Sequence, residues 1–81
     1  MAINDDLVYV RTSARYAKGK IALTIPGVGG WKSTAALILT TKIAPNARFS
    51  HRERAYIVSV HQADRFEQAI ADLRIKREAE G

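Results

Sequence analysis

The basic and aromatic side chains of this sequence are the ones whose chemistry could serve a function. Lys and Arg number 13 against 8 Asp and Glu, for a net charge of +5 over 81 residues. Residues 7–54 hold nine basic residues and one acid, Glu53, whereas residues 61–81 hold four basic and five acidic residues. Positive charge gathered in one part of a chain is typical of a surface that binds a polyanion. The sequence therefore favours a nucleic-acid partner, with an acidic protein surface as a further option.

Two sets of side chains in this basic part match the two components of single-strand binding. Cationic groups hold phosphates, and aromatic rings stack on unpaired bases. We expect the phosphate-binding set to comprise Arg11, Arg15, Lys18, Lys20, Lys42, Arg52 and Arg54, with Lys32 and Arg48 at its rim. We expect the stacking set to comprise Tyr9, Trp31 and Phe49. The alternative interpretation is a solvated basic face on which Tyr9 and Trp31 are ordinary packing residues.

Other chemistries fit the sequence poorly. The segment from Gly27 to Thr34 is similar to a phosphate-binding loop, but Trp31 stands where that motif requires glycine. His51 and His61 lie ten positions apart and cysteine is absent, so no metal site is expected. No Ser/His/Asp set can be identified. We predict a protein that is not an enzyme and that needs no cofactor.

Length and composition indicate one small domain over residues 1–81. A chain of this size buries a modest core and is marginally stable alone. The lack of cysteine fits a reducing compartment, and Asp5 and Asp6 stand where a secretory signal would be basic. No apolar run is long enough to cross a bilayer. These features predict a cytoplasmic protein with no membrane partner.

Strand signals occupy most of the basic part. Alternating polarity predicts strands over 7–16 and 21–25, joined by a hairpin in which Gly19 supplies a positive φ. Residues 34–43 mix helix formers with β-branched residues, and we interpret them as a strand with a helix as the alternative. Residues 48–54 are interpreted as a basic connector. The apolar residues 55–60 complete a set of four strands.

A helix follows the fourth strand. Ser59 and Gln62 have the spacing of a capping box. One apolar stripe then recurs at helical spacing as far as about residue 77, and consists of Ala63, Phe66, Ile70 and Leu73. The predicted fold is α+β, a four-stranded antiparallel sheet with one C-terminal amphipathic helix packed on one face.

The strand periodicity also predicts which side chains face away from that helix. Tyr9, Arg11 and Arg15 share one face of the first strand, and we expect them to point away from the helix together with Lys20 and Lys42. Ile38 and Ile57 are placed opposite the core by the same reasoning. Apolar groups there, beside unpaired sheet edges, suggest a homodimer.

The order of these elements resembles the transcriptional positive-cofactor, whirly-type family of single-stranded-DNA-binding proteins. The resemblance rests on residues 16–25, YAKGKIALTI, and on residues 56–66, YIVSVHQADRF. It implies a dimer whose paired sheets form a channel for unpaired DNA strands. It also implies that Lys18, Lys20 and Arg11 occupy the places of binding residues.

Two other functions remain open from the sequence. Small basic proteins of phages and other mobile elements, including inhibitors of bacterial defence complexes, have this length and layout, which suggests a protein that binds and inhibits a protein complex. A structural oligomer without a ligand is the third possibility.

Overall fold

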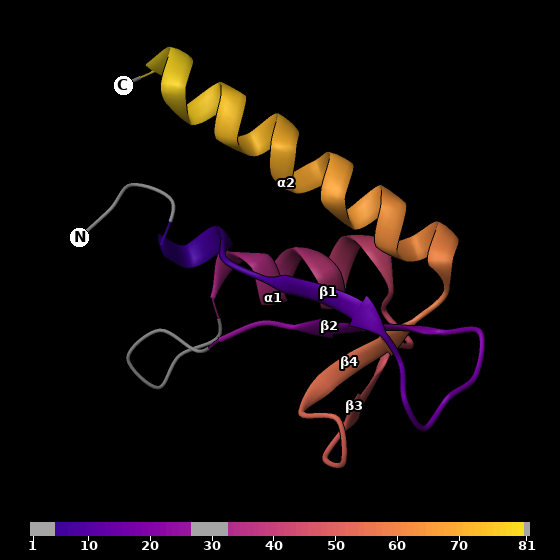
Figure 1. Ribbon diagram of the computed structural model, residues 1–81. Coiled ribbons are helices and arrows are strands. Elements are labelled where there is room, and N and C mark those ends of the chain that lie inside the picture. Colours follow the sequence, from indigo (N-terminus) through magenta and orange to yellow (C-terminus); the bar gives the residue numbers. More distant parts are fainter. Residues whose placement is uncertain (1–4, 27–32, 81) are drawn as a thin grey trace.

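The computed structural model describes residues 5–26 and 33–80 and has an α+β architecture (Figure 1). A short 3-10 helix, η1 (Asp5–Leu7), precedes strands β1 (Val10–Ser13) and β2 (Ile21–Thr24). Helix α1 (Thr34–Ile38) continues into a π-helical turn, η2 (Leu39–Ile43). Strands β3 (Arg48–Ser50) and β4 (Ala55–Val58) then lead into the long helix α2 (Val60–Glu80). The predicted fold class is confirmed.

The four strands form one sheet in the order β1-β2-β4-β3, and every neighbouring pair is antiparallel. The connection between β1 and β2 closes in a tight turn, in which the Lys20 backbone N–H donates to the Ala17 carbonyl at 3.0 Å. Gly19 has a φ of 79° in this turn, a conformation that glycine adopts without steric cost. The hairpin and the role of its glycine were therefore predicted correctly.

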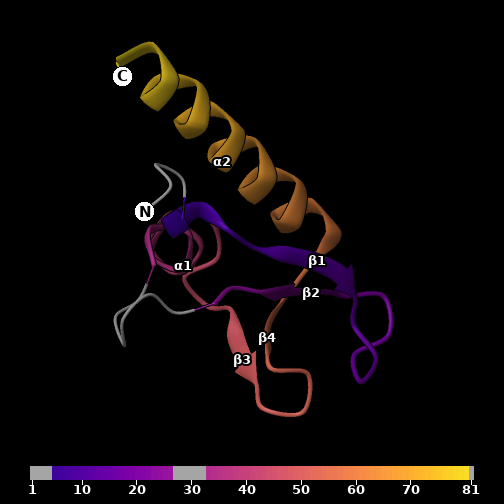
Figure 2. The same ribbon diagram turned by 60° about the vertical axis from the view of Figure 1, so that its left-hand side comes forward.

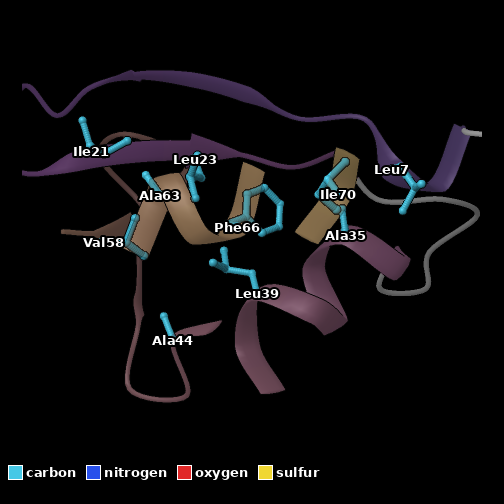
Figure 3. Close-up of a cluster of buried hydrophobic side chains, with 10 residues drawn as sticks. All are labelled: Leu7, Ile21, Leu23, Ala35, Leu39, Ala44, Val58, Ala63, Phe66 and Ile70. Atoms are coloured by element: carbon cyan, nitrogen blue, oxygen red, sulfur yellow. The ribbon is translucent and has the colours of Figure 1, made fainter. Parts of the chain in front are cut away.

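Both helices cover the same face of the sheet, and the core lies between the two layers (Figure 3). Leu23 points from β2 toward Phe66 of α2, and Leu39 of η2 lies beneath that ring. All three side chains are fully buried. The apolar stripe of α2 is confirmed, because Ala63, Phe66 and Ile70 are buried and Leu73 packs against the same cluster.

Residues 34–43 are helical, so their interpretation as a strand was wrong. The Ser33 side chain caps the helix by accepting a hydrogen bond from the Ala36 backbone N–H at 3.2 Å. The Thr40 hydroxyl donates to the Ala36 carbonyl at 2.9 Å, which accommodates a β-branched residue in the helix. Burial of Ala35 and Leu39 against the core outweighs the strand propensity of the threonines and isoleucines.

The fourth strand of the sheet is found instead at residues 48–50. These residues were interpreted as part of a connector, yet β3 pairs with β4, Phe49 opposite Tyr56 and Arg48 opposite Ile57. The first strand is also shorter than predicted, since only Val10–Ser13 pairs in the sheet. The number of strands was right, although one of them was assigned to the wrong segment.

Helix α2 begins as the capping box predicts. The Gln62 backbone N–H donates to Ser59 Oγ at 3.1 Å, and the Ser59 N–H donates to Gln62 Oε1 at 3.0 Å. The helix extends to Glu80, a few residues beyond the predicted end near residue 77. Within residues 5–26 and 33–80, no helix is long and apolar enough to span a bilayer.

Candidate nucleic-acid interface

One face of the sheet carries no helix, and we call it the helix-free face. Four residues that are paired from strand to strand lie across it, namely Thr12, Ala22, Ile57 and Arg48. Each of them alternates along its own strand with residues that face the core. Two connections flank this face, the loop of residues 14–20 and the turn of residues 51–54. Both extend away from α2 in two views of the molecule (Figure 2).

These two connections meet and enclose a hollow of about 250 Å³. The Arg15 backbone N–H donates to the Glu53 side chain, and the Arg52 guanidinium lies 5.4 Å from the centre of the Tyr16 ring. The residues that line the hollow are Thr12, Ser13, Arg15, Tyr16, Ala22, Arg52 and Glu53. Segments that are remote in the sequence thus form one site with two arginines, a tyrosine, two hydroxyl groups and one carboxylate.

Several predicted binding residues lie on these connections. Arg15, Lys18 and Lys20 are exposed on the loop, and Arg52 and Arg54 are exposed on the turn. Among the residues that the structure describes, the only ion pairs are those of Arg11 and Arg77. The cations around the hollow therefore form no ion pair within the described ranges, although Glu53 lies in the same lining. Cationic side chains in this state can hold an anionic ligand.

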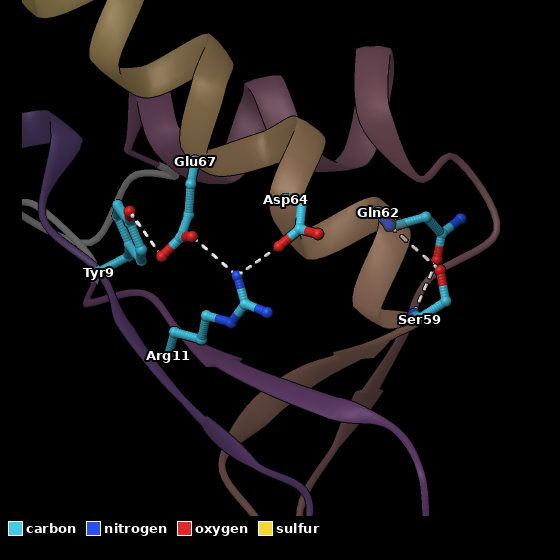
Figure 4. Close-up of polar contacts among 6 residues, drawn as sticks. All are labelled: Tyr9, Arg11, Ser59, Gln62, Asp64 and Glu67. Carbon is cyan, nitrogen blue, oxygen red and sulfur yellow. Dashed lines mark hydrogen bonds and ion pairs between the residues drawn. The ribbon is translucent and has the colours of Figure 1, made fainter.

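Tyr9 and Arg11 face helix α2, so the prediction that they point away from it was wrong (Figure 4). One Arg11 nitrogen lies 2.8 Å from Asp64 and 2.7 Å from Glu67, and the Tyr9 hydroxyl donates to Glu67 at 3.2 Å. The Tyr9 ring also packs edge-on against Phe66, with ring centres 4.9 Å apart. These side chains join the sheet to the helix and are not part of the helix-free face.

The electrostatics of this contact follow from its geometry. Burial, assisted by the negative charge of Glu67, raises the pKa of Tyr9 above its ordinary value. Hydrogen bonds to Asp64 and Glu67 raise the pKa of Arg11, which stays charged. Within Val10–Ser13 the chain alternates as predicted, but the covered side is decided by Ile21 and Leu23 of β2, which carry the larger apolar groups.

Lys42 and Phe49 also differ from their predicted positions. Lys42 is exposed at the end of η2, in the helical layer and not on a strand. Phe49 lies opposite Tyr56 on the covered side of the sheet, where the residue is 48% exposed and its ring contacts Tyr56 and His51 edge-on. Trp31 and Lys32 lie outside the described residues.

The two isoleucines that suggested a homodimer are not equivalent. Ile38 packs against the core from α1, so its placement opposite the core was wrong. Ile57 does lie on the helix-free face, where it is half-buried. Self-association stays a prediction.

The aromatic residue at the hollow, Tyr16, was missing from the predicted stacking set. Strict alternation through residues 7–16 would place Tyr16 on the face opposite Arg11 and Arg15. The chain leaves the sheet after Ser13, so Tyr16 and Arg15 line the same hollow. Residues 14–18 contain no glycine or proline, so the sequence carries no local signal that the strand ends before Tyr16.

The described residues contain no group of three or more His, Asp or Glu side chains that could hold a metal ion. The chain matches no protein-family model, no curated protein and no solved structure in the comparisons made. The site is therefore interpreted from its own residues.

Proposed function

We propose that this chain is a non-enzymatic protein that binds single-stranded nucleic acid on its helix-free face. The observation that carries the proposal is the convergence of the 14–20 loop and the 51–54 turn around one hollow with Arg15, Tyr16 and Arg52 in its lining. Lys18, Lys20, Arg48 and Arg54 add exposed positive charge on the same loop, turn and neighbouring strand. Such a surface suits a phosphate backbone, which supplies one negative charge per nucleotide.

The aromatic ring of Tyr16 favours a single strand over a duplex as the ligand of this site. The Tyr16 side chain is among the most exposed large apolar groups of the described residues, at 63%. An exposed ring can stack on an unpaired base, whereas the bases of a duplex are already stacked on one another. The hollow beside this ring is recessed, and a base that leaves the strand can enter it.

Arg54 supports the proposal through its backbone. It has a φ of 53°, and among the described residues it is the only non-glycine residue with a positive φ. Glycine is favoured in that conformation, so an arginine there lowers stability. A strained residue that supplies an exposed cation beside the hollow is consistent with a binding role.

The proposal is tested by removing two charges from the hollow. The double variant Arg15→Ala/Arg52→Ala should bind a single-stranded oligonucleotide more weakly than the unmodified chain does. The slope of log affinity against log salt concentration should become shallower by roughly 0.7 for each lost phosphate contact. Fluorescence anisotropy at several salt concentrations measures both quantities.

The matched control is Arg65→Ala/Lys76→Ala, which removes the same charge from exposed positions of α2. Its affinity and salt slope should stay close to those of the unmodified chain. Equal losses in the two double variants would show that net charge, and not the hollow, governs binding. An unchanged slope in the hollow variant would remove this face from the account.

A further inference from the structure

Glu53 is the only acid in an otherwise basic site, and its two carboxylate oxygens have different surroundings. Oε1 accepts a hydrogen bond from the Arg15 backbone N–H, which ties the 51–54 turn to the 14–20 loop. Oε2 is buried and has no hydrogen-bond partner among the described residues. A buried acceptor without a donor is unfavourable, and such groups in folded proteins call for an explanation.

A carboxylate here also weakens the attraction of the site for phosphate. If the hollow only held the backbone of a strand, a neutral residue at position 53 would serve better. The arrangement is explained if the hollow receives the part of a nucleotide that carries hydrogen-bond donors, which is the base. The phosphates are then held by exposed cations around the base, which are Arg15 at the hollow and Lys18, Lys20 and Arg54 beside it.

The other lining residues suit a base. The Arg52 guanidinium occupies one side of the Tyr16 ring, and the high exposure of Tyr16 leaves room for stacking. Arginine planes and aromatic rings both stack on unpaired bases. Thr12 and Ser13 add hydroxyl groups that can donate to or accept from a base edge.

We propose that the hollow takes one unstacked base of the bound strand and that Glu53 selects guanine. Guanine presents two adjacent N–H donors, N1–H and the N2 amino group, on its Watson–Crick edge, which matches a carboxylate. Thymine and uracil present a single N–H between two carbonyl oxygens, and those oxygens face the carboxylate unfavourably. This inference rests on the proposed single-strand function and adds a base preference to it.

Binding of a base to Glu53 Oε2 requires side chains around the hollow to move. Oε2 is enclosed, so a base edge reaches it only after side chains at the mouth of the hollow shift. Tyr16 and Arg52 lie on connections and not on paired strands. Rotamer changes of such exposed side chains are common when an interface forms.

The test compares short oligothymidylates whose central base is guanine, cytosine, adenine or thymine. Fluorescence anisotropy with the full chain should show the tightest binding for central guanine, by about fivefold or more over central thymine. The Glu53→Gln variant should lose this preference, because one acceptor oxygen is replaced by an amide donor. The exposed Glu78 on α2 provides the control, since Glu78→Gln changes the charge equally and should keep the preference.

The outcomes separate this inference from the function on which it rests. Equal affinity for the four oligonucleotides overturns guanine selection, even while salt-sensitive binding continues to support the single-strand function. The series on the unmodified chain decides this without any substitution. Absence of binding to every strand overturns both proposals. Displacement of the guanine-containing strand by an equimolar amount of free guanosine monophosphate would overturn recognition within a strand, since a free nucleotide would then suffice.

Discussion

Arg11 and Arg15 belong to the same hairpin but have different surroundings. Arg11 contacts Asp64 and Glu67 of α2, and its charge is neutralised within the fold. Arg15 is exposed beside the hollow, and its backbone N–H, not its guanidinium, makes the contact to Glu53. Sequence periodicity grouped these two arginines together. What separates them is the end of β1 at Ser13, after which the chain no longer alternates between faces.

The strained backbone of Arg54 leads to a prediction at the same scale. Arg54→Gly should leave the free energy of unfolding unchanged or raise it by up to about 1 kcal/mol, because glycine adopts the positive φ more readily. The same substitution should weaken oligonucleotide binding by removing a cation. Urea denaturation and anisotropy measure the two effects.

A matched comparison for Arg54→Gly is Gly19→Ala, which forces a side chain into a positive φ of 79° with open space around it. That variant should be destabilised by about 1 kcal/mol. A clear loss of stability in Arg54→Gly would contradict the conformational argument. Unchanged affinity would remove Arg54 from the binding surface.

At the scale of elements, the features that local signals predicted are those whose partners lie close in sequence. The capping box of α2 joins Ser59 to Gln62, and the apolar stripe repeats within one helix. Residues 34–43 were interpreted incorrectly because their helix depends on remote partners. Ala35 and Leu39 are buried in one cluster with Leu23, Phe66 and Ile70, which their own segment does not contain.

The hollow could not be predicted from the sequence for a related reason. Arg15 and Glu53 are separated by 38 positions, and only the fold brings them together. The basic residues of the site were identified by composition alone, whereas Tyr16 and Glu53 were not. Neither the bend of the 14–20 loop nor its contact with the 51–54 turn has a local sequence signal.

One contact joins three elements and predicts a dependence on pH. Arg77 of α2 donates to the Asp6 carboxylate at 2.6 and 3.0 Å, and the Thr34 hydroxyl of α1 donates to the same group. Hydrogen bonds from Arg77 and Thr34 hold the pKa of Asp6 well below its usual range. A lowered carboxyl pKa stabilises the fold above the unfolded value, near 4, and this contribution is lost as pH falls toward the folded value.

We therefore predict that Asp6→Asn lowers the free energy of unfolding at pH 7 by roughly 1 kcal/mol. The variant should also lose less stability than the unmodified chain does between pH 5 and pH 3. Urea denaturation at several pH values provides the measurement. Glu78→Gln, on an exposed part of α2, should change neither quantity noticeably. A steeper acid dependence in Asp6→Asn would contradict the assigned contact.

At the scale of the whole molecule, charge and architecture divide the protein into two sides. The side that carries α2 includes the acids of residues 61–81, and two of them neutralise Arg11. The opposite side carries the 14–20 loop, the 51–54 turn and the hollow between them. If the proposed function is correct, an anionic strand would be attracted more strongly to that side than to the side of α2.

The central claim is tested most directly by comparing a labelled single-stranded oligonucleotide with its matching duplex at two salt concentrations. Fluorescence anisotropy with the unmodified chain should show tighter binding to the single strand, and affinity should fall steeply as salt rises. Equal or tighter binding to the duplex would contradict the stacking role of Tyr16. Absence of binding to either at low salt would contradict the proposed function and leave an acidic protein surface as the partner of the helix-free face.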